Sequence, residues 1–344
     1  MDARPRILIS DSTLRDGSHA VQHQLDAEQI GSYAAAANAA RVPIVEVGHG
    51  NGLGASSLQV GESRVSDREM LRIARSQLTH AQLGVFGIPG FATIRHLDVA
   101  IEEGADLFRV GAHCTEADLT ERHVTYLRGL DKPVYGVLMM SHMASPERLV
   151  EEARKIESYG AHGVIIMDSA GALLLDDVRR RVAALIAGTS LVVGFHGHEN
   201  VSLGMANSLA AVKEGASILD GTARGFGAGA GNTQLEVLVA VLDRLGYETG
   251  IDLYAMLDAA EHAERELVQV LPTTDSITIV SGLAGVFSGY SKPVRRIATQ
   301  FCVDPRDILF ALGRRSVVAG QEDVILEVAN ALREHTQAQR EMRE

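Results

Sequence analysis

The sequence predicts an α/β protein, a (β/α)8 TIM barrel followed by a small C-terminal helical domain. Eight short runs rich in β-branched residues alternate with longer helical patterns over residues 6–245, which is typical of parallel βαβ units. Eight units match the usual size of a closed barrel. A doubly wound open sheet would not need eight repeats, and no G-x-G-x-x-G follows the first run.

The expected strands are short apolar runs that begin with RILIS and end with SILDGT. They cover residues 6–10, 43–48, 82–87, 106–111, 133–140, 163–168, 190–198 and 217–222. The expected helices lie near residues 27–40, 66–76, 91–103, 118–128, 146–158, 174–187, 201–214 and 232–245. Several helical patterns start at a capping residue and end near glycine, as in SPERLVEEARKIESYG, which predicts where these helices begin and end.

Beyond residue 250 the alternation of strands and helices stops. DLYAMLDAAEHAERELVQV and the stretch from PRDILFALGRR to NALREH have helical patterns, and a Gly/Ser-rich passage over residues 281–291 joins them. We therefore expect the barrel in residues 1–270 and a helical domain in residues 271–344.

Composition limits the classes of function. The 344 residues include 32 Lys and Arg against 44 Asp and Glu, a net charge of −12, which argues against nucleic acid or an anionic membrane as partner. Two cysteines are too few for a disulfide framework, and the first ten residues contain no apolar signal segment. We expect a soluble cytoplasmic protein.

Polar residues gather where the expected strands end, which is where barrel enzymes carry their active sites. His196 and His198 are two apart on the seventh strand, so both imidazoles point to one face. Asp16 follows the neighbouring first strand. Two imidazoles and one carboxylate that leave open positions suit a divalent metal such as Mn, Fe or Zn, whereas an H-x-H pair by itself is more often structural.

Other residues of the stretch DSTLRDGSHAVQH are candidates for the chemistry. Arg15 beside a metal would stabilise an enolate or carboxylate oxygen, and His19 has the pKa range of a general base. Either residue in isolation is more often a solvated surface group. His23, His49 and His113 are interpreted as structural, and GFGAGAGN as a close backbone approach, because a P-loop would have a Lys-Ser/Thr.

Four motifs in order, DSTLRDGSHAVQHQ, VEVGHGNGLGASS, HGHEN and GAGAGNTQLEV, resemble the metal-dependent TIM barrels with a D-x-T-L-R-D-G opening. The 4-hydroxy-2-oxovalerate aldolase family is the nearest member, and the likeness runs from about residue 7 to beyond 330, including the helical tail. Hydroxymethylglutaryl-CoA lyases have a catalytic Cys in the glycine-rich loop, which this sequence lacks. Biotin-linked carboxyltransferases have a Lys where Met167 stands.

The resemblance implies a mechanism. Mn2+ held by Asp16, His196 and His198 would chelate a 4-hydroxy-2-oxo acid, with His196 also close to the substrate. Arg15 would stabilise the pyruvate enolate, and His19 would take the C4 hydroxyl proton. Ser169 resembles a residue that holds the substrate carboxylate. The aldehyde would pass through a tunnel to an acylating aldehyde dehydrogenase docked on the helical domain, and an oligomer is expected.

The sequence departs from the family around the aldehyde. Phe287 stands where the family has Tyr, and Tyr290 is the nearest candidate replacement. Phe86, Gly87 and Ile88 replace the leucines of the family's LLLPG, and Asn51 replaces the Asp of HGDG. We therefore expect an altered aldehyde, either larger or aromatic, and condensation for biosynthesis as the direction. Two alternatives remain, a Claisen-type synthase that joins an acyl-CoA to a 2-oxo acid and an inactive docking subunit for a dehydrogenase.

Overall fold

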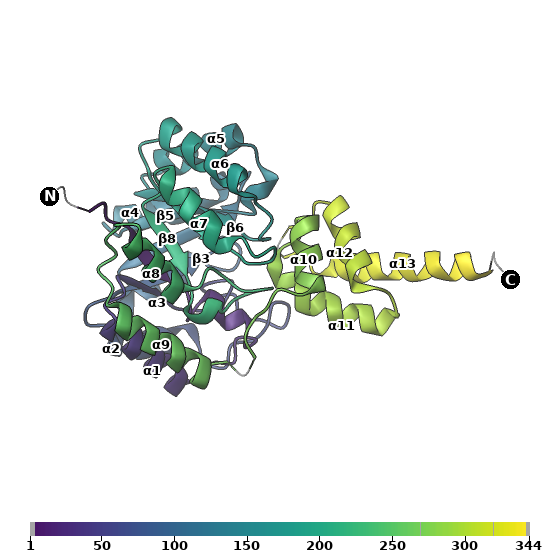
Figure 1. Ribbon diagram of the computed structural model, residues 1–344, viewed down its shortest axis with the longest axis horizontal. Coiled ribbons are helices and arrows are strands. Elements are labelled where there is room, and N and C mark those ends of the chain that lie inside the picture. The colour runs from purple at the N-terminus through teal and green to yellow at the C-terminus, as the bar shows by residue number, and fades with distance from the viewer. Residues whose placement is uncertain (1–3, 269, 319, 342–344) are drawn as a thin grey trace.

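A computed structural model describes residues 4–268, 270–318 and 320–341. Eight parallel strands form a closed barrel in sequence order, in which β1 pairs with both β2 and β8. Their bounds are β1 Leu8–Asp11, β2 Ile44–Glu46, β3 Gln82–Gly87, β4 Leu107–His113, β5 Val134–Met139, β6 Gly163–Asp168, β7 Val192–Gly197 and β8 Ile218–Gly221. The predicted TIM barrel is confirmed (Figure 1).

Helices surround the barrel, and further helices form a separate group beyond it. The α-helices are α1 Ala27–Ala39, α2 Asp67–Gln77, α3 Ile94–Glu102, α4 Glu121–Gly129, α5 Pro146–Ser158, α6 Leu175–Gly188, α7 Gly204–Lys213, α8 Leu235–Arg244, α9 Leu253–Glu266, α10 Ser276–Ala284, α11 Ser291–Phe301, α12 Pro305–Arg314 and α13 Asp323–Glu341. Short 3-10 helices are η1 Asp16–His19, η2 Ala117–Thr120, η3 Ser141–Met143, η4 Ala223–Gly225 and η5 Ser288–Tyr290. No helix within the described residues is long and apolar enough to cross a membrane.

Local chemistry explains why the predicted helix boundaries agree so closely with the structure. In α5 the Ser145 side chain accepts a hydrogen bond from the backbone N–H of Arg148, and Pro146 occupies the first turn, where its missing N–H costs nothing. The chain then leaves the helix through Gly160, whose φ of 93° suits glycine. The helix therefore spans residues 146–158 as predicted.

The molecule has two large apolar cores. The main core lies between the strands and the surrounding helices, and it includes Met256 and Ala263 of α9, which packs against α1. The second core is formed by α10–α13 and begins at Ile277. Thus α9 packs with the barrel, although its sequence lies beyond the point where the alternation stops.

The Gly/Ser-rich passage at 281–291 is mostly helical, so its interpretation as a connecting passage was wrong. Ser281 and Gly282 lie inside α10, and η5 and the start of α11 follow after a short turn. A Cβ at Gly282 would lie 2.8 Å from the side chain of Val201 and 3.2 Å from the carbonyl oxygen of Gly171. Small residues here allow the helix to approach the barrel closely.

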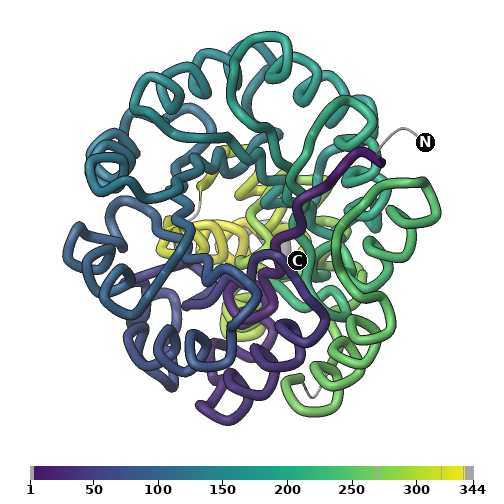
Figure 2. The backbone as a smooth tube through the Cα atoms, turned by 90° about the vertical axis from the view of Figure 1, so that its left-hand side faces the viewer, coloured from purple at the N-terminus to yellow at the C-terminus, as the bar shows by residue number. Residues whose placement is uncertain are grey.

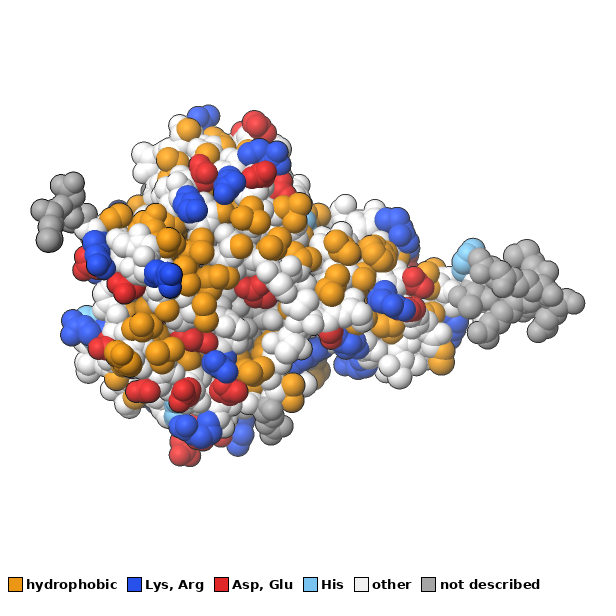
Figure 3. All heavy atoms as spheres, viewed as in Figure 1, with side chains coloured by type: hydrophobic (Ala, Val, Ile, Leu, Met, Phe, Trp, Pro, Cys, Tyr) orange, Lys and Arg blue, Asp and Glu red, His pale blue; other side chains and the backbone are white. Residues whose placement is uncertain are grey.

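The helical domain sits over the C-terminal end of the barrel strands. In the view along the barrel it lies behind the ring of helices, near the centre (Figure 2). The backbone N–H of Ser288 donates to the carbonyl of Ser169, 3.0 Å away, and the Ser288 hydroxyl donates to Asn200 at 3.1 Å. After the neighbouring strand β5, His142 bonds the carbonyl of Gly285. The surface view shows the two lobes in contact, with charges of both signs spread over the barrel (Figure 3).

Candidate functional site

His196 of β7 and His198, which directly follows this strand, lie together in a buried position at the C-terminal end of the barrel. Nδ1 of His196 donates to Asp220, 2.9 Å away, and Nδ1 of His198 donates to the carbonyl of Asp168 at 3.0 Å. Both Nε2 atoms are buried and have no hydrogen-bond partner among the described residues. Each imidazole is therefore oriented by one nitrogen and has a free lone pair on the other.

Asp16 completes this group from η1, the short helix that follows β1. Ligand atoms of Asp16, His196 and His198 all lie within 4.8 Å of one another, and Asp16 Oδ2 is 3.7 Å from His198 Nε2. All three residues are buried. A carboxylate with two unpartnered imidazole nitrogens fits a divalent metal, because a buried lone pair without a partner is otherwise costly.

Electrostatics keep Asp16 and His198 in the states that bind a metal. Burial alone would raise the pKa of Asp16, but Arg15 and the imidazoles of His198 and His196 lower it far below its usual value. Burial lowers the pKa of His198 to about 3. At neutral pH the carboxylate is ionised and this imidazole is neutral, as metal ligation requires.

Asn232 also contacts this group, and no specific sequence signal pointed to it. Its Nδ2 donates to Asp16 Oδ2 and to the carbonyl of Phe226, while its Oδ1 is buried without a partner among the described residues. A Cβ at Gly227 would collide with Asn232 and lie 2.8 Å from Asp16 Oδ2. The glycine-rich loop therefore provides a close backbone approach, as expected, and it does so around a side chain of the metal site.

A buried series of alternating positive and negative side chains connects Arg15 with His196. Arg15 Nε donates to Glu46 at 2.7 Å and Nη1 to Asp16 at 2.7 Å. Glu46 also lies 3.7 Å from Arg109, whose two terminal nitrogens donate to Asp220 at 2.6 and 2.8 Å. Asp220 in turn accepts from His196. Every member is at most 4% exposed, so the chain links the guanidinium of Arg15 to a metal-site imidazole without contact with water.

His19 lies at the rim of the same mouth, on the last residue of η1. A Cβ at Gly50 would collide with its imidazole, so the GHGNG motif leaves space for this ring. Burial lowers the pKa of His19. His23 packs against His19 with ring centres 4.8 Å apart and stacks on His49 at 3.6 Å. These two histidines support the rim, in keeping with their structural interpretation.

Ser169 is buried beside the metal group, directly after β6. Its hydroxyl accepts from the backbone N–H of Met140, 3.0 Å away, and its carbonyl accepts from Ser288. The hydroxyl proton is therefore still able to donate to a ligand.

The aromatic ring of Phe86 forms one wall of the barrel interior. It packs with Val137, Ile165 and Met167, and Ile88 is partly buried next to it. The Arg15 guanidinium lies 4.9 Å from the ring centre. A Cβ on Gly111 would lie 2.6 Å from the tip of this ring, so a glycine on β4 makes room for the phenylalanine, and no sequence pattern linked the two.

Gly87 does not reshape the interior as its sequence position suggested. A Cβ there would lie 2.9 Å from Cβ of Ala92, in the segment that leads into α3. Successive residues of a strand face opposite sides, so Phe86 and Ile88 face inwards while residue 87 faces the surrounding helices.

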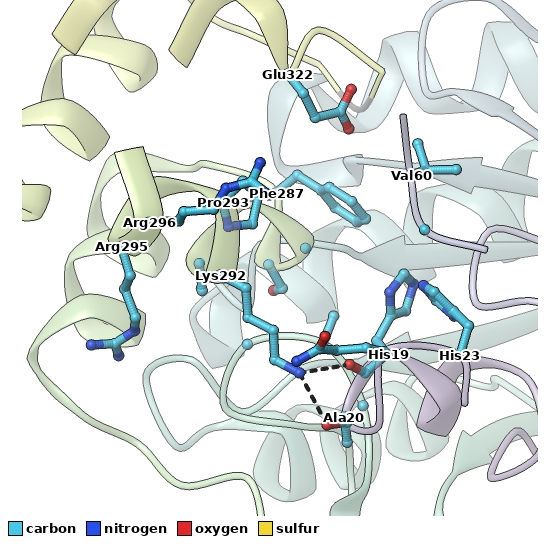
Figure 4. A pocket seen from close by; sticks show the side chains of 18 of the residues that line it. His19, Ala20, His23, Val60, Phe287, Lys292, Pro293, Arg295, Arg296 and Glu322 are labelled. Carbon is cyan, nitrogen blue, oxygen red and sulfur yellow. Dashed lines mark hydrogen bonds between the residues drawn. The ribbon is translucent and has the colours of Figure 1, made fainter. Parts of the chain in front are cut away.

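The rings of Phe287 and Tyr290 are in edge-to-face contact, with ring centres 5.9 Å apart, but the two side chains face different surroundings. Phe287 lines a cavity of about 1480 Å³ between the barrel mouth and the helical domain, together with His19, Asn51 and Gly227 (Figure 4). The hydroxyl of Tyr290 donates to the carbonyl of Val318 at 2.6 Å, inside the helical core. The expectation that Tyr290 replaces the family tyrosine at the mouth is therefore not supported, because its hydroxyl is bonded within the other domain.

Comparisons with known proteins find matches to both the barrel and the helical domain. Residues 6–262 match the HMGL-like family, and residues 272–334 match the DmpG-like communication domain. A 4-hydroxy-2-oxovalerate aldolase of Spirochaeta aurantia is 60% identical over 331 residues, which cover 96% of this chain and 97% of that protein. The 4-hydroxy-2-oxovalerate aldolase of Pectobacterium atrosepticum is 58% identical over 328 residues, 95% of this chain and 96% of that one.

A more distant likeness concerns the fold. The carboxyl transferase domain of Rhizobium etli pyruvate carboxylase, solved with pyruvate and biocytin, superposes with a TM-score of 0.80 at 17% sequence identity. The match covers 94% of this chain and 60% of that one. At this identity the likeness shows a shared barrel architecture.

Proposed function

The chain belongs to the HMGL-like family and, within it, to the 4-hydroxy-2-oxovalerate aldolases, and from this premise we propose a divalent-metal aldolase that cleaves or forms a 4-hydroxy-2-oxo acid. The cleavage products are a 2-oxo acid, pyruvate or 2-oxobutanoate, and an aldehyde. The observation that carries the proposal is the convergence of Asp16, His196 and His198 at the C-terminal end of the barrel. Such an enzyme is a carbon–carbon lyase.

We propose Mn2+ as the ion that Asp16, His196 and His198 hold. The unpartnered Nε2 atoms and the ionised carboxylate provide its ligands. When bound, the ion supplies a Lewis acid for the carboxylate and keto oxygens of a 2-oxo acid. The Ser169 hydroxyl has a free proton to donate to the same carboxylate.

Arg15 is positioned to stabilise negative charge in the transition state. Its Nε and Nη1 are held by Glu46 and Asp16, whereas its Nη2 is buried without a partner among the described residues. When the C3–C4 bond breaks, its electron pair is delocalised onto the C2 oxygen as an enolate. A fixed guanidinium with one free donor stabilises that oxygen most strongly when its charge develops.

His19 is the base in this proposal. The lowered pKa leaves its imidazole neutral at neutral pH, so the ring can accept the proton of the C4 hydroxyl while C4–O becomes the aldehyde carbonyl. In the condensing direction, His19 returns the proton to the new C4 hydroxyl. The position of the ring at the rim, against Gly50, is consistent with a group that exchanges protons near the cavity.

We propose that the aldehyde differs from that of the named relatives. Phe86 and Ile88 line the interior wall and Phe287 lines the cavity without a phenol hydroxyl. A larger or aromatic aldehyde would pack against these rings, and the missing hydroxyl would weaken control of C4 stereochemistry. Restoring it in Phe287→Tyr is expected to raise the enantiomeric excess at C4, measured by chiral chromatography of the aldol product.

The helical domain is proposed to dock an acylating aldehyde dehydrogenase, in agreement with its match to the DmpG-like communication domain. Neither described cysteine is in a disulfide, which is consistent with the expected cytoplasmic location. The oligomeric state stays a prediction.

An assay of the purified protein with Mn2+ tests the proposal. Pyruvate or 2-oxobutanoate is incubated with a panel from acetaldehyde to benzaldehyde, and the aldol is measured by mass spectrometry, with a chelated sample and Asp16→Asn as controls. Metal-dependent aldol formation or cleavage is expected. If acetaldehyde is the best substrate by a wide margin, the altered aldehyde specificity is wrong while the aldolase remains.

The rival functions give different results in the same experiment. An acyl-CoA synthase would release thiol from acetyl-CoA and a 2-oxo acid. A docking subunit would show no metal-dependent turnover with any aldehyde, although it would still bind its dehydrogenase. The buried candidate metal ligands favour the aldolase over the docking subunit, because a scaffold has no need to bury two unpartnered imidazole nitrogens beside a carboxylate.

A further inference from the structure

Lys292 of the helical domain reaches across the cavity to the catalytic loop of the barrel. Its ammonium donates to the carbonyl of His19 at 3.1 Å and to that of Ala20 at 3.0 Å (Figure 4). Lys292 occupies the second position of α11. Its contacts are therefore with the end of η1, the segment that carries both Asp16 and His19.

Electrostatic attraction explains why the Lys292 ammonium contacts these two carbonyls. The last carbonyls of a helical turn carry partial negative charge, which a cation stabilises. In the described part of the chain no carboxylate forms an ion pair with Lys292, whereas its neighbour Arg295 pairs with Asp275. The two backbone carbonyls are therefore the partners that hold this ammonium.

The helical domain provides a fixed base for this side chain. Ser288, four residues earlier, is bonded through its backbone to Ser169 and through its hydroxyl to Asn200. The α11 helix packs in its own apolar core through Val294 and Ile297. Lys292 thus extends from an element that is attached to the barrel at independent points.

We propose that Lys292 is a positioning residue, which holds the end of η1 so that the His19 imidazole stays over the barrel mouth. The inference rests on the proposed aldolase function, in which His19 is the base. Gly50 limits the ring on one side, and the hold on the His19 and Ala20 carbonyls limits its backbone on the other. Both restraints act on the position of one proton acceptor.

The solvent exposure of Lys292 limits the effect on kcat that its removal should have. Lys292 is exposed overall, so water competes for its hydrogen bonds and they are worth less than buried ones. We expect Lys292→Met to lower kcat about fivefold, with KM changed less than twofold, because misplacing the base affects the transition state more than substrate binding. Lys292→Arg, which keeps the charge, is expected to recover at least half of the lost kcat.

The matched control is Arg296→Met. Arg296 is an exposed cation one turn further along α11 that lines the same cavity, and unlike Lys292 it forms no hydrogen bond or ion pair within the described residues. This variant is expected to keep the kcat of the wild type. The variant removes the same charge from the same helix. It therefore distinguishes loss of the hydrogen bonds to the end of η1 from a general effect of the lost charge.

A second measurement is independent of turnover. Hydrogen–deuterium exchange of the full chain reports the N–H groups of Ala20, Gln22 and His23, which bond to carbonyls within this segment. Faster exchange over residues 17–23 is expected in Lys292→Met and not in Arg296→Met. Unchanged exchange together with unchanged kcat in Lys292→Met would overturn the proposal, as would equal losses in both variants or a global loss of stability that accounts for the lower kcat.

The two hypotheses can fail separately. If the wild type shows no aldol activity, the proposed function fails, and the exchange experiment still decides whether Lys292 holds η1. If the wild type is active and both measurements on Lys292→Met match it, only the positioning role fails.

Discussion

Asp220→Asn is expected to weaken Mn2+ binding 10- to 100-fold, because Asp220 determines which nitrogen of His196 is free. Its Oδ2 accepts from both His196 Nδ1 and Arg109, and its Oδ1 accepts from Arg109. An amide has only one oxygen. If its nitrogen faces His196, the imidazole must give up its Nδ1 proton and carry it on Nε2, the nitrogen proposed to bind the metal.

The other orientation of the amide is no better. Its nitrogen would then face a guanidinium N–H of Arg109, and two donors would oppose each other where all groups are at most 3% exposed. Loss of such an outer partner typically lowers metal affinity 10- to 100-fold, about 1.4–2.7 kcal/mol. Breaking a buried ion pair costs about 3–5 kcal/mol of stability, and Arg109 would retain only Glu46 at 3.7 Å.

The assay is calorimetric titration of Mn2+ into chelated protein, with urea unfolding of the same samples. Asp11→Asn is the matched control, because Asp11 is also a buried aspartate at the end of a strand, but it bonds Thr13 and Tyr33 instead of an imidazole. Its Mn2+ affinity is expected to stay within about threefold of the wild type. A folded Asp220→Asn protein with wild-type affinity would refute the reasoning.

Three further predictions concern the barrel. Asp16→Asn is expected to abolish Mn2+ binding and turnover while circular dichroism stays that of the wild type; normal turnover would remove Asp16 from the metal site. Burial raises the pKa of Asp11 to about 6, above its unfolded value, so the stability that this residue contributes is full below pH 4 and is lost as pH rises through 6. The unfolding free energy of Asp11→Asn relative to wild type should therefore increase by about 2 kcal/mol from pH 4 to pH 7, and a pH-independent difference in urea melts would contradict this. Gly111→Ala is expected to cost about 1–3 kcal/mol through its contact with Phe86, and adding Phe86→Leu should recover most of that loss in urea melts, unless the clash is relieved by movement of β4.

Much of the fold was predictable because its signals are local. The strands over residues 82–87 and 163–168 and the helix over 146–158 have the predicted bounds, since capping residues, glycines and apolar runs mark them directly. The passage at 281–291 was wrongly interpreted as a connecting passage because that prediction also relied on local signals. Glycine and serine indicate a loop locally, whereas here Gly282 is required by the close approach of α10 to Val201 and Gly171, a contact between segments far apart in sequence.

The convergence of the three candidate metal ligands was predictable because strand geometry converts sequence spacing into position. His196 and His198 must share a face, and ring closure brings β1 next to β8, so that Asp16 lies near them. The residues expected to contact the aldehyde could not be interpreted from alignment to a family pattern alone. Gly87 counts as a change in the motif but faces outwards, and Tyr290 is near Phe287 in sequence while its hydroxyl is bonded to Val318.

The buried network of charged residues could not be found from sequence, because burial of each charge is explained only by its contacts with the others. Glu46, Arg109 and Asp220 lie on three different strands, and each alone would be costly in a barrel interior. Together with Arg15 and Asp16 they form a set of three carboxylates and two guanidiniums. The set has one negative charge in excess, which favours a bound cation over an empty site. The same interactions fix the Arg15 guanidinium and the His196 imidazole before substrate arrives, so the orientation of both groups adds no reorganisation cost when the carbon–carbon bond breaks.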